Sequence, residues 1–418
     1  METGHFDVIV IGGGPAGSTA GTLLAKHGWK VLILEKEKFP RFKIGESMLP
    51  GSLRTLDRMG VKKKIDAADV VIKRGGRIIL GCGDKTNEFL FNDVFRCVQA
   101  TSYQVKRALF DKILLDHTAE NGCTVKQETA VKEISFDQDG VTVTTSAGAG
   151  FRAGYVVDCS GRASLLGSKF RFKKSYSHLK KVALFAHFED VAIGSDEDLA
   201  LTHMVRGENK WFWLIPINKV KTSIGVVMDS HEFKRMKLDP ERAFEKICDS
   251  YPPLVDRLKN ARRVMPVQTT SDYSYRNRRF TGDRWISAGD AAGFIDPVWS
   301  SGVYIAILSG EKAAYALNRV MRAPEKKARE FGNFERRIHR VMDLYLKFVT
   351  SWYTPQFGEV FFNPKEFLRL VPAVNSILAG DDRGLFEVRW RIWVFHLLTF
   401  LQGKSKIVAP KMNFEPMP

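Results

Sequence analysis

The sequence has 418 residues, 44% of them hydrophobic and 27% charged, which is typical of a globular protein with two or three domains. We find no apolar run of about 18 residues, and the start of the chain lacks the basic and apolar regions of a signal peptide. The five cysteines are scattered, without metal-ligand spacing. We therefore expect a cytoplasmic protein with reduced thiols, no membrane span and no metal site.

The formal net charge is +17, and the basic residues are spread over many segments of the chain. Such a charge favours solubility or an acidic partner, which could be a protein, a membrane or a nucleic acid. No nucleic-acid-binding motif accompanies the basic segments, so we expect no nucleic-acid partner.

The first 35 residues predict a strand–helix–strand unit. Residues 6–11 are apolar and β-branched, residues 18–27 have a helical pattern that Gly28 ends, and residues 30–35 form a second apolar run. Between the first strand and the helix stands Gly12-x-Gly14-x-x-Gly17, the fingerprint of a dinucleotide-binding turn.

Each part of this fingerprint has a physical purpose. Gly12 makes the turn, Gly14 lets a pyrophosphate approach the backbone, and Gly17 lets the helix pack closely on the strand. Glu35 would accept hydrogen bonds from ribose hydroxyls, and its charge disfavours a 2′-phosphate. The unit therefore predicts NAD or FAD as the ligand, and not NADP.

A helix is predicted over residues 51–59, and residues 70–80 are typical of strand–turn–strand with Lys73 just before the turn. On its own, this lysine is most simply a solvated side chain at a strand end. A helix is then expected from Tyr103 to about residue 120, followed by strands near 125–131, 141–145 and 152–157.

Asp158-Cys-Ser-Gly-Arg162 resembles a second turn of the dinucleotide fold. Residues 182–268 are mostly strand-like, interrupted by a helix over 240–258, and indicate a sheet inserted into the nucleotide-binding domain. Within it, Trp211 and Trp213 are two residues apart and would lie on one face of a strand. The plain interpretation of this pair is core packing.

Residues 289–302 combine small residues, two acids, Pro297 and finally Ser300-Ser301-Gly302 before a helix over residues 303–322. A helix start offers free N–H groups and partial positive charge, which suits an anion. From about residue 332 the chain is helical and rich in aromatic residues, and from Lys404 we expect a loose polar tail.

These patterns predict an α/β (α+β) protein with three parts. The nucleotide-binding domain would comprise residues 1–70, 98–170 and 281–330. The β-sheet substrate domain would comprise residues 71–97 and 171–280, and a helical C-terminal region would span 331–418.

Four motifs stand out together. They are Gly12-x-Gly14-x-x-Gly17, Gly45-Glu46-Ser47 with Leu49-Pro50, Trp211-x-Trp213-x-Ile215-Pro216, and Phe294-x-Asp296-Pro297 with Ser300-Ser301-Gly302. This combination resembles the flavin-dependent halogenases. The first is common to class A flavin monooxygenases, whereas the tryptophan motif is the discriminating one. The resemblance implies an FAD-binding Rossmann-like domain of the glutathione-reductase/PHBH type. The compact length is more similar to halogenases of phenols or pyrroles.

This resemblance implies a reaction. A separate reductase supplies FADH2, O2 converts it to a C4a-hydroperoxyflavin, and a halide, chloride or bromide, becomes hypohalous acid. Lys73 matches the family's lysine, which relays the halogen as a chloramine or through a hydrogen bond to an electron-rich ring. The substrate would be a phenol or pyrrole, either free or tethered to an acyl or peptidyl carrier protein. The sequence does not decide whether the protein is a homodimer.

The resemblance also implies site residues. Ser301 and Gly302 would bind halide, with Ser301 where many relatives have threonine, and Trp211, Trp213 and Pro297 would lie near the active site. In the region after Asp296 we find no equivalent of the glutamate that tryptophan halogenases use as a base. The remaining cofactor-binding residues would be Gly12, Gly14, Ala16, Gly17, Glu35, Arg41, Ser47, Gln104, Arg107, Asp290 and Gly293.

Two other enzyme classes share the FAD motifs. A class A aromatic monooxygenase would oxidise NAD(P)H by itself, and the tryptophan motif and Lys73 speak against it. A geranylgeranyl-reductase-like enzyme would lack the paired tryptophans.

Overall fold

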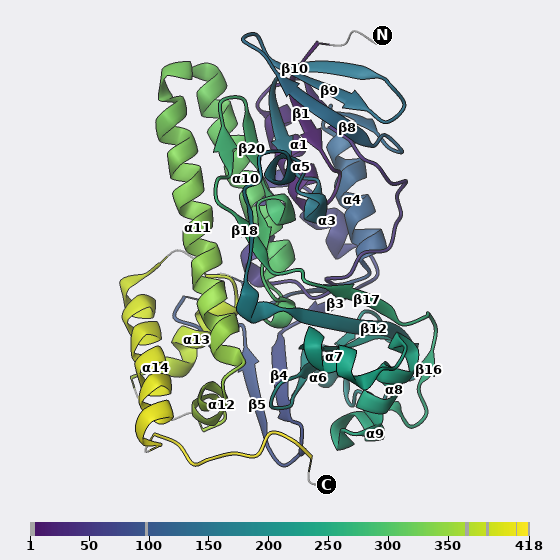
Figure 1. Cartoon of the computed structure of the whole chain (residues 1–418), viewed down its shortest axis with the longest axis vertical. Helices are drawn as coiled ribbons and strands as arrows, with labels where there is room; N and C mark the ends of the chain where they lie inside the picture. The colour runs from purple at the N-terminus through teal and green to yellow at the C-terminus, as the bar shows by residue number, and fades with distance from the viewer. Residues whose placement is uncertain (1–4, 97–98, 364–367, 382–383, 407, 417–418) are drawn as a thin grey trace.

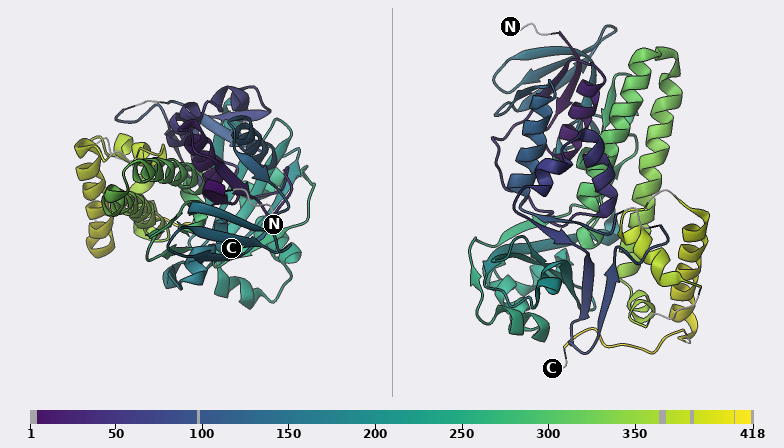
Figure 2. Two further views of the ribbon diagram at one scale, coloured as in Figure 1. Left: turned by 90° about the horizontal axis from the view of Figure 1, so that it is seen from above. Right: turned by 180° about the vertical axis from the view of Figure 1, so that it is seen from behind.

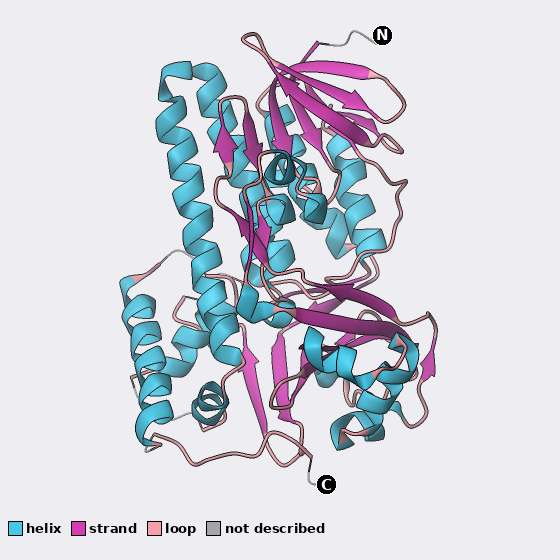
Figure 3. Cartoon of the chain, in the orientation of Figure 1, coloured by secondary structure: helices cyan, strands magenta, loops and turns pink. Residues whose placement is uncertain are grey.

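The protein is described by a computed structural model that covers residues 5–96, 99–363, 368–381, 384–406 and 408–416. Its mixed α/β architecture confirms the predicted fold class. Two large sheets occupy the two halves of an elongated molecule, and long helices run along one side (Figure 1; Figure 3). Within the described residues, no helix combines the length and the apolar character that a membrane crossing requires.

The first sheet is built on the predicted strand–helix–strand unit. Its strands run in the order β19-β20-β10-β1-β2-β7, with β9 and β8 continuing from β10. They are β1 (His5–Ile11), β2 (Val31–Leu34), β7 (Thr124–Lys126), β8 (Val131–Phe136), β9 (Val141–Thr145), β10 (Gly150–Asp158), β19 (Thr281–Gly282) and β20 (Trp285–Ser287). Helices α1 (Pro15–Lys26), α4 (Arg107–Glu120) and α10 (Ser301–Arg322) pack together, α1 against both others.

The second large sheet has the order β16-β12-β15-β14-β13-β4-β5, with β17 also on β12. Its strands are β4 (Gly75–Leu80), β5 (Thr86–Leu90), β12 (Lys181–Glu189), β13 (Leu201–Arg206), β14 (Trp211–Pro216), β15 (Lys221–Asp229), β16 (Arg262–Arg263) and β17 (Gln268–Ser271). The helices on this half are α6 (Asp196–Leu199), α7 (Ser230–Met236), α8 (Pro240–Asp249) and α9 (Pro252–Leu258). The chain passes between the two halves several times, and the exact domain boundaries stay a prediction.

Two smaller sheets and three short helices lie outside the two large sheets. The small strands are β3 (Val70–Lys73) with β6 (Ser102–Val105), and β11 (Lys173–Ser175), β18 (Tyr275–Asn277) and β21 (Gly293–Phe294). The short helices are α2 (Leu53–Met59), α3 (Lys62–Asp66) and α5 (Leu165–Lys169). The C-terminal helices are α11 (Lys327–Trp352), α12 (Pro355–Phe361), α13 (Leu370–Leu378) and α14 (Phe386–Ser405), seen from behind in Figure 2.

The structure differs from the predicted elements in three places. Residues 103–105 belong to a strand, because they pair with β3, and the helix begins only at Arg107. The predicted strand–turn–strand over 70–80 is two strands in different sheets. The helix expected over 240–258 is divided into α8 and α9, because consecutive prolines follow Tyr251 and proline lacks the N–H that a continuing helix needs.

The predicted loose tail is instead packed on the second sheet. Phe414 is buried, and the guanidinium carbon of Arg206 lies 4.7 Å from its ring centroid. The Glu415 carboxylate accepts hydrogen bonds from the Glu208 N–H and the Tyr251 hydroxyl. The sequence pattern missed this because single apolar and acidic residues without periodicity give no local signal.

Candidate active site

A cavity of about 480 Å3 lies where the nucleotide-binding fingerprint meets the second sheet. Its lining extends from Glu35 at the end of β2 to Trp211 and Trp213 on β14. The predicted site residues that line it are Gly12, Gly14, Ala16, Glu35, Arg41, Ser47, Arg107, Asp290, Pro297, Gly302, Trp211 and Trp213. Lys73, Gly17, Gln104, Gly293 and Ser301 are not part of this lining.

The fingerprint glycines are required by close approaches of the backbone. A Cβ at Gly12, whose φ is +100°, would stand 2.3 Å from the Cys159 carbonyl oxygen, and one at Gly17 would stand 1.9 Å from the Gly12 carbonyl oxygen. The Glu35 carboxylate accepts from the Gly13 N–H at 2.7 Å and from the Glu37 N–H at 2.9 Å. These bonds hold the carboxylate at the cavity wall, where ribose hydroxyls would meet it.

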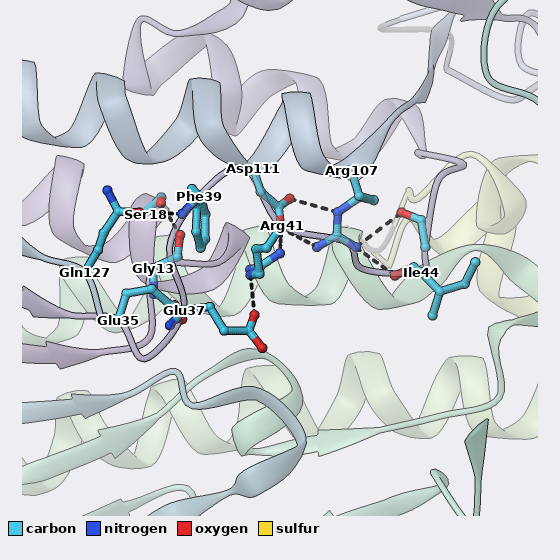
Figure 4. Close-up of polar contacts among 11 residues, drawn as sticks. Gly13, Ser18, Glu35, Glu37, Phe39, Arg41, Ile44, Arg107, Asp111 and Gln127 are labelled. Carbon is cyan, nitrogen blue, oxygen red and sulfur yellow. Dashed lines mark hydrogen bonds and ion pairs between the residues drawn. The ribbon is translucent and has the colours of Figure 1, made fainter. Parts of the chain in front are cut away.

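Arg41 and Arg107 share one buried carboxylate (Figure 4). Asp111 accepts from Arg41 Nη1 at 2.8 Å and from the Nε and Nη2 of Arg107, each at 2.8 Å. Arg107 also donates to the Ile44 carbonyl at 3.0 Å. These hydrogen bonds of Arg107 go to protein groups and not toward a ligand, and they fix the loop that leads to Glu46. The i,i+4 spacing of Arg107 and Asp111 on one helix is a signal that the sequence offered.

Asp290 lies on the cavity wall near the positive charges of Arg107 and Arg162. Burial raises the pKa of its carboxyl to about 6, and those two guanidinium groups oppose the shift. The side chain therefore loses its proton as the pH rises through about 6. At neutral pH it would be a carboxylate that accepts hydrogen bonds.

Lys73 at the end of β3 is almost completely buried, with 1% of its surface exposed. Its Nζ donates to Ser47 Oγ at 2.8 Å and lies 5.2 Å from the ring centroid of Phe91. Burial lowers the pKa of the amine to about 7, since no carboxylate among the described residues offsets the desolvation. The local pattern favoured a solvated lysine at a strand end, and the structure shows that this expectation is wrong, because Lys73 is buried.

Ser47 connects this lysine to the cavity, and its hydrogen bonds have a definite direction. Thr202 Oγ1 donates to Gln104 Oε1 at 3.1 Å, so Thr202 accepts the single hydroxyl proton of Ser47 across 3.0 Å. The Ser47 oxygen in turn accepts from Lys73 and, at 3.2 Å, from Ser300 Oγ. Gln104, predicted as a cofactor contact, stands at the end of this chain and also donates to the Leu199 carbonyl at 2.9 Å.

The start of α10 is placed directly beside Ser47. Ser300 precedes the helix with φ +53°, a left-handed conformation that is uncommon for a side-chain-bearing residue. Its side chain makes no capping bond to the helix and donates to Ser47 instead. The first N–H groups of α10, which include those of Ser301 and Gly302, have no intrahelical acceptor and suit an anion. Gly293 is packed against Tyr275 and Met342.

Trp211 and Trp213 lie on the same face of β14, with ring centroids 5.8 Å apart. Trp213 covers Gly225 on the neighbouring strand, where a Cβ would stand 2.2 Å from its ring, and donates to Ser223 Oγ at 3.1 Å. Trp211 Nε1 donates to the Tyr353 hydroxyl at 3.0 Å, and that hydroxyl donates to Asp296 Oδ2 at 2.7 Å.

Sequence reasoning did not foresee three contacts of this site. Asp296 and Tyr353 form the contact above, and burial raises the pKa of Asp296 to about 6. Glu46 lines the cavity and is bonded to His187 Nε2 at 2.8 Å. Ser300 belongs to the motif that was expected to hold the halide, but its hydrogen bond to Ser47 was not foreseen. Local sequence spacing cannot predict the Asp296–Tyr353 and Glu46–His187 contacts, because the partners are far apart in the chain. The position of Ser300 in its motif was a usable signal. In the described part of the chain, His, Cys, Asp and Glu form no group of three that could hold a metal ion.

The model of the FAD binding domain family matches residues 5–333. The residues present fit this cofactor, because a glycine turn, an acid at the second strand and a cavity reaching the tryptophan pair belong to one continuous site. The protein is therefore an FAD-binding flavoprotein.

Curated relatives narrow the class. The chain is 31% identical over 379 residues to a 1H-pyrrole-2-carbonyl-[peptidyl-carrier protein] chlorinase of Pseudomonas fluorescens, covering 84% of each chain. It is 32% identical over 333 residues to the corresponding brominase of Pseudoalteromonas luteoviolacea, covering 77% of this chain and 79% of the relative. The solved flavin-dependent brominase Bmp2 superposes with a TM-score of 0.85 at 28% identity, over 96% of this chain and 100% of that one. The chain belongs to the flavin-dependent halogenases and is an oxidoreductase.

Proposed function

We propose that this halogenase uses FADH2, O2 and chloride or bromide to make hypohalous acid, and that Lys73 directs the halogen onto an electron-rich aromatic ring. When bound, the reduced flavin with O2 supplies the oxidising equivalent that the halide needs. Lys73 carries the proposal, because a buried amine with a pKa of about 7 is available in both its neutral and its protonated form.

The remaining roles follow from position. Ser301 and Gly302 would hold the halide with backbone N–H groups at the start of α10. The tryptophan pair would close the cavity against the substrate, so that only a small oxidant reaches Lys73 past Ser47. Gly12, Gly14, Glu35 and Asp290 would hold the cofactor along the cavity.

The substrate we propose is a pyrrole or phenol, with a carrier-tethered pyrrole favoured by two relatives that act on one by name. A separate reductase would supply FADH2. The purified chain should then consume no NAD(P)H alone, and NAD(P)H oxidation by the pure protein would contradict this part of the proposal.

The decisive experiment compares Lys73→Met with Lys210→Met, a partly buried lysine that is paired with Glu232. Both variants receive FADH2 from a reductase, bromide and a panel of phenols and carrier-bound pyrroles. Lys73→Met should lose at least about 100-fold in product formation, while FAD binding and flavin oxidation persist. Product formation equal to that of Lys210→Met would rule out the role of Lys73.

A further inference from the structure

The outer face of α14 is apolar and open to solvent. Five of the exposed large apolar side chains in the described chain lie on this helix, and we call them the α14 face: Phe386, Trp393, Leu397, Phe400 and Leu401. Phe386 is 77% exposed, Trp393 62% and Phe400 60%. The opposite side of the helix already packs inward through Val388, Ile392 and Phe395. An apolar stripe that remains after the core is filled is typical of an interaction surface.

The charge around this stripe is positive. α14 carries Arg389, Arg391 and Lys404 against the single acid Glu387. Together with the net charge of +17, this rim attracts an acidic partner and steers it toward the apolar stripe. The partner chemistry that fits is therefore an acidic protein with an apolar patch.

One short segment joins the base of α14 to Lys73. The Arg391 guanidinium lies 4.5 Å from the ring centroid of Phe95, and Phe91, four residues earlier, lies below Lys73. Four residues of fully extended chain span at most about 14 Å. The α14 rim is thus within reach of a flexible arm that ends at the lysine.

A small depression of about 30 Å3 lies along this segment. Its lining includes Phe91, Arg54 and Arg96, together with Gly380 beyond the end of α13. Ser376 of α13 lines it too and accepts from the Phe95 N–H at 3.1 Å. The two arginines offer donors to an anionic arm, while Phe91 itself is buried between the depression and Lys73.

We propose that the α14 face docks an acidic carrier protein whose flexible arm passes this depression and brings a tethered aromatic ring to Lys73. This inference rests on the proposed halogenase function and adds the place where its partner binds. A free small aromatic needs no such surface, so the two modes of delivery can be separated experimentally.

The test uses the double variant Trp393→Glu/Phe400→Glu in the full chain, with Val220→Glu/Val255→Glu as the matched control. Both pairs replace exposed apolar side chains by acids, and the control pair is 55% and 45% exposed on the second half of the molecule. The probes are a pyrrole-2-carboxyl-loaded peptidyl carrier protein and the same acid as a small soluble thioester. A second test variant, Arg389→Glu/Lys404→Glu, reverses the charge around the α14 face. It is used if the first variant does not fold.

We expect kcat/KM on the loaded carrier to fall at least tenfold in both α14 variants, with turnover of the small thioester unchanged within twofold. Equal activity of test and control variants on the carrier overturns the docking site, as does a wild type that halogenates only free aromatics. A wild type that halogenates no probe or phenol contradicts the proposed function itself.

Two other occupants are separate outcomes, and either overturns the proposal. Binding of wild type to phosphatidylglycerol vesicles that the α14 variants lose, with unchanged carrier kinetics, would assign the face to a membrane. A wild-type dimer that becomes monomeric in the variants, measured by light scattering, would assign it to a second copy.

Discussion

Lys73 Nζ and Ser47 Oγ lie 2.8 Å apart, and the lysine is the donor in this bond. Since Ser47 gives its only proton to Thr202, it cannot donate to the amine. One N–H of Lys73 is therefore oriented toward Ser47, and the lone pair of the neutral amine points elsewhere. This orientation gives a reason why a serine, and not an acid, stands beside the lysine.

Replacing Ser47 by alanine should impair halogen transfer without loss of FAD. The variant removes the acceptor of Lys73 and of Ser300, and one hydrogen bond to a charged group contributes about 1.5–3 kcal/mol, so product formation should fall roughly tenfold or more. More hypohalous acid should escape to an added scavenger. Ser52→Ala is the control, because Ser52 is equally buried and its Oγ has no hydrogen-bond partner within the described structure. Equal behaviour of both variants would contradict the orienting role.

The pH profile of halogen transfer should report on Lys73. With a pKa of about 7, the amine loses its proton as the pH rises through neutrality. If the neutral amine accepts halogen, the rate rises through pH 7 and then levels off, and this is the outcome we expect. A rate that falls through pH 7 would instead indicate an ammonium that polarises hypohalous acid. Single-turnover measurements with preformed hypobromous acid isolate this step from flavin oxidation.

Stability should also depend on this lysine. Its ordinary pKa is 10.5 and its folded pKa is about 7, so the unfolded chain binds more protons between these values. The Lys73 contribution to unfolding free energy then rises with pH in this window, by at most about 1.4 kcal/mol per unit. Lys73→Met should remove that slope and should exceed wild type in stability most clearly below pH 7. Urea unfolding at pH 6.5 and 9.5 measures it, and parallel pH dependences of the two proteins would refute the burial effect.

Asp111→Asn should weaken FAD binding. The substitution keeps the shape but removes the charge that pairs with Arg41 and Arg107, and breaking a buried pair costs about 3–5 kcal/mol. We expect at least tenfold lower FAD affinity by fluorescence titration, together with a lower melting temperature. Asp116→Asn on the same helix should change neither, since its exposed pair with Lys112 contributes little. Lower stability with unchanged FAD affinity would show that the pair does not shape the cavity.

Tyr353→Phe should raise the KM for halide more than it lowers kcat. Asp296 accepts from Tyr353 and, at 3.1 Å, from the Val298 N–H in the turn that leads to Ser300. Loss of the hydroxyl frees this turn, and we expect about a tenfold weaker halide interaction. Tyr345→Phe on α11 is the matched control, because its hydroxyl donates to the Ile377 carbonyl at 3.0 Å. The measurement is a halide titration of both variants, with chloride NMR line width as a readout without turnover. Equal halide affinity of the two variants would contradict the prediction.

The sequence by itself determined the features that depend on neighbouring residues. The glycine fingerprint and Glu35 lie within one strand–helix–strand unit, so local spacing was enough to predict a dinucleotide site. The alternation of a strand placed Trp211 and Trp213 on one face, as the 5.8 Å between their ring centroids confirms. The helix start after Ser300 was likewise a local signal.

Only the tertiary structure decided how these parts meet. Lys73 is buried because β3 pairs with residues 102–105, a segment whose local pattern favoured a helix. Asp296 meets Tyr353 from 57 residues away, and Asp111 meets Arg41 from 70 residues away. The physical reason is that desolvation and pairing of charged groups depend on everything packed around them, and most of that packing comes from distant parts of the chain.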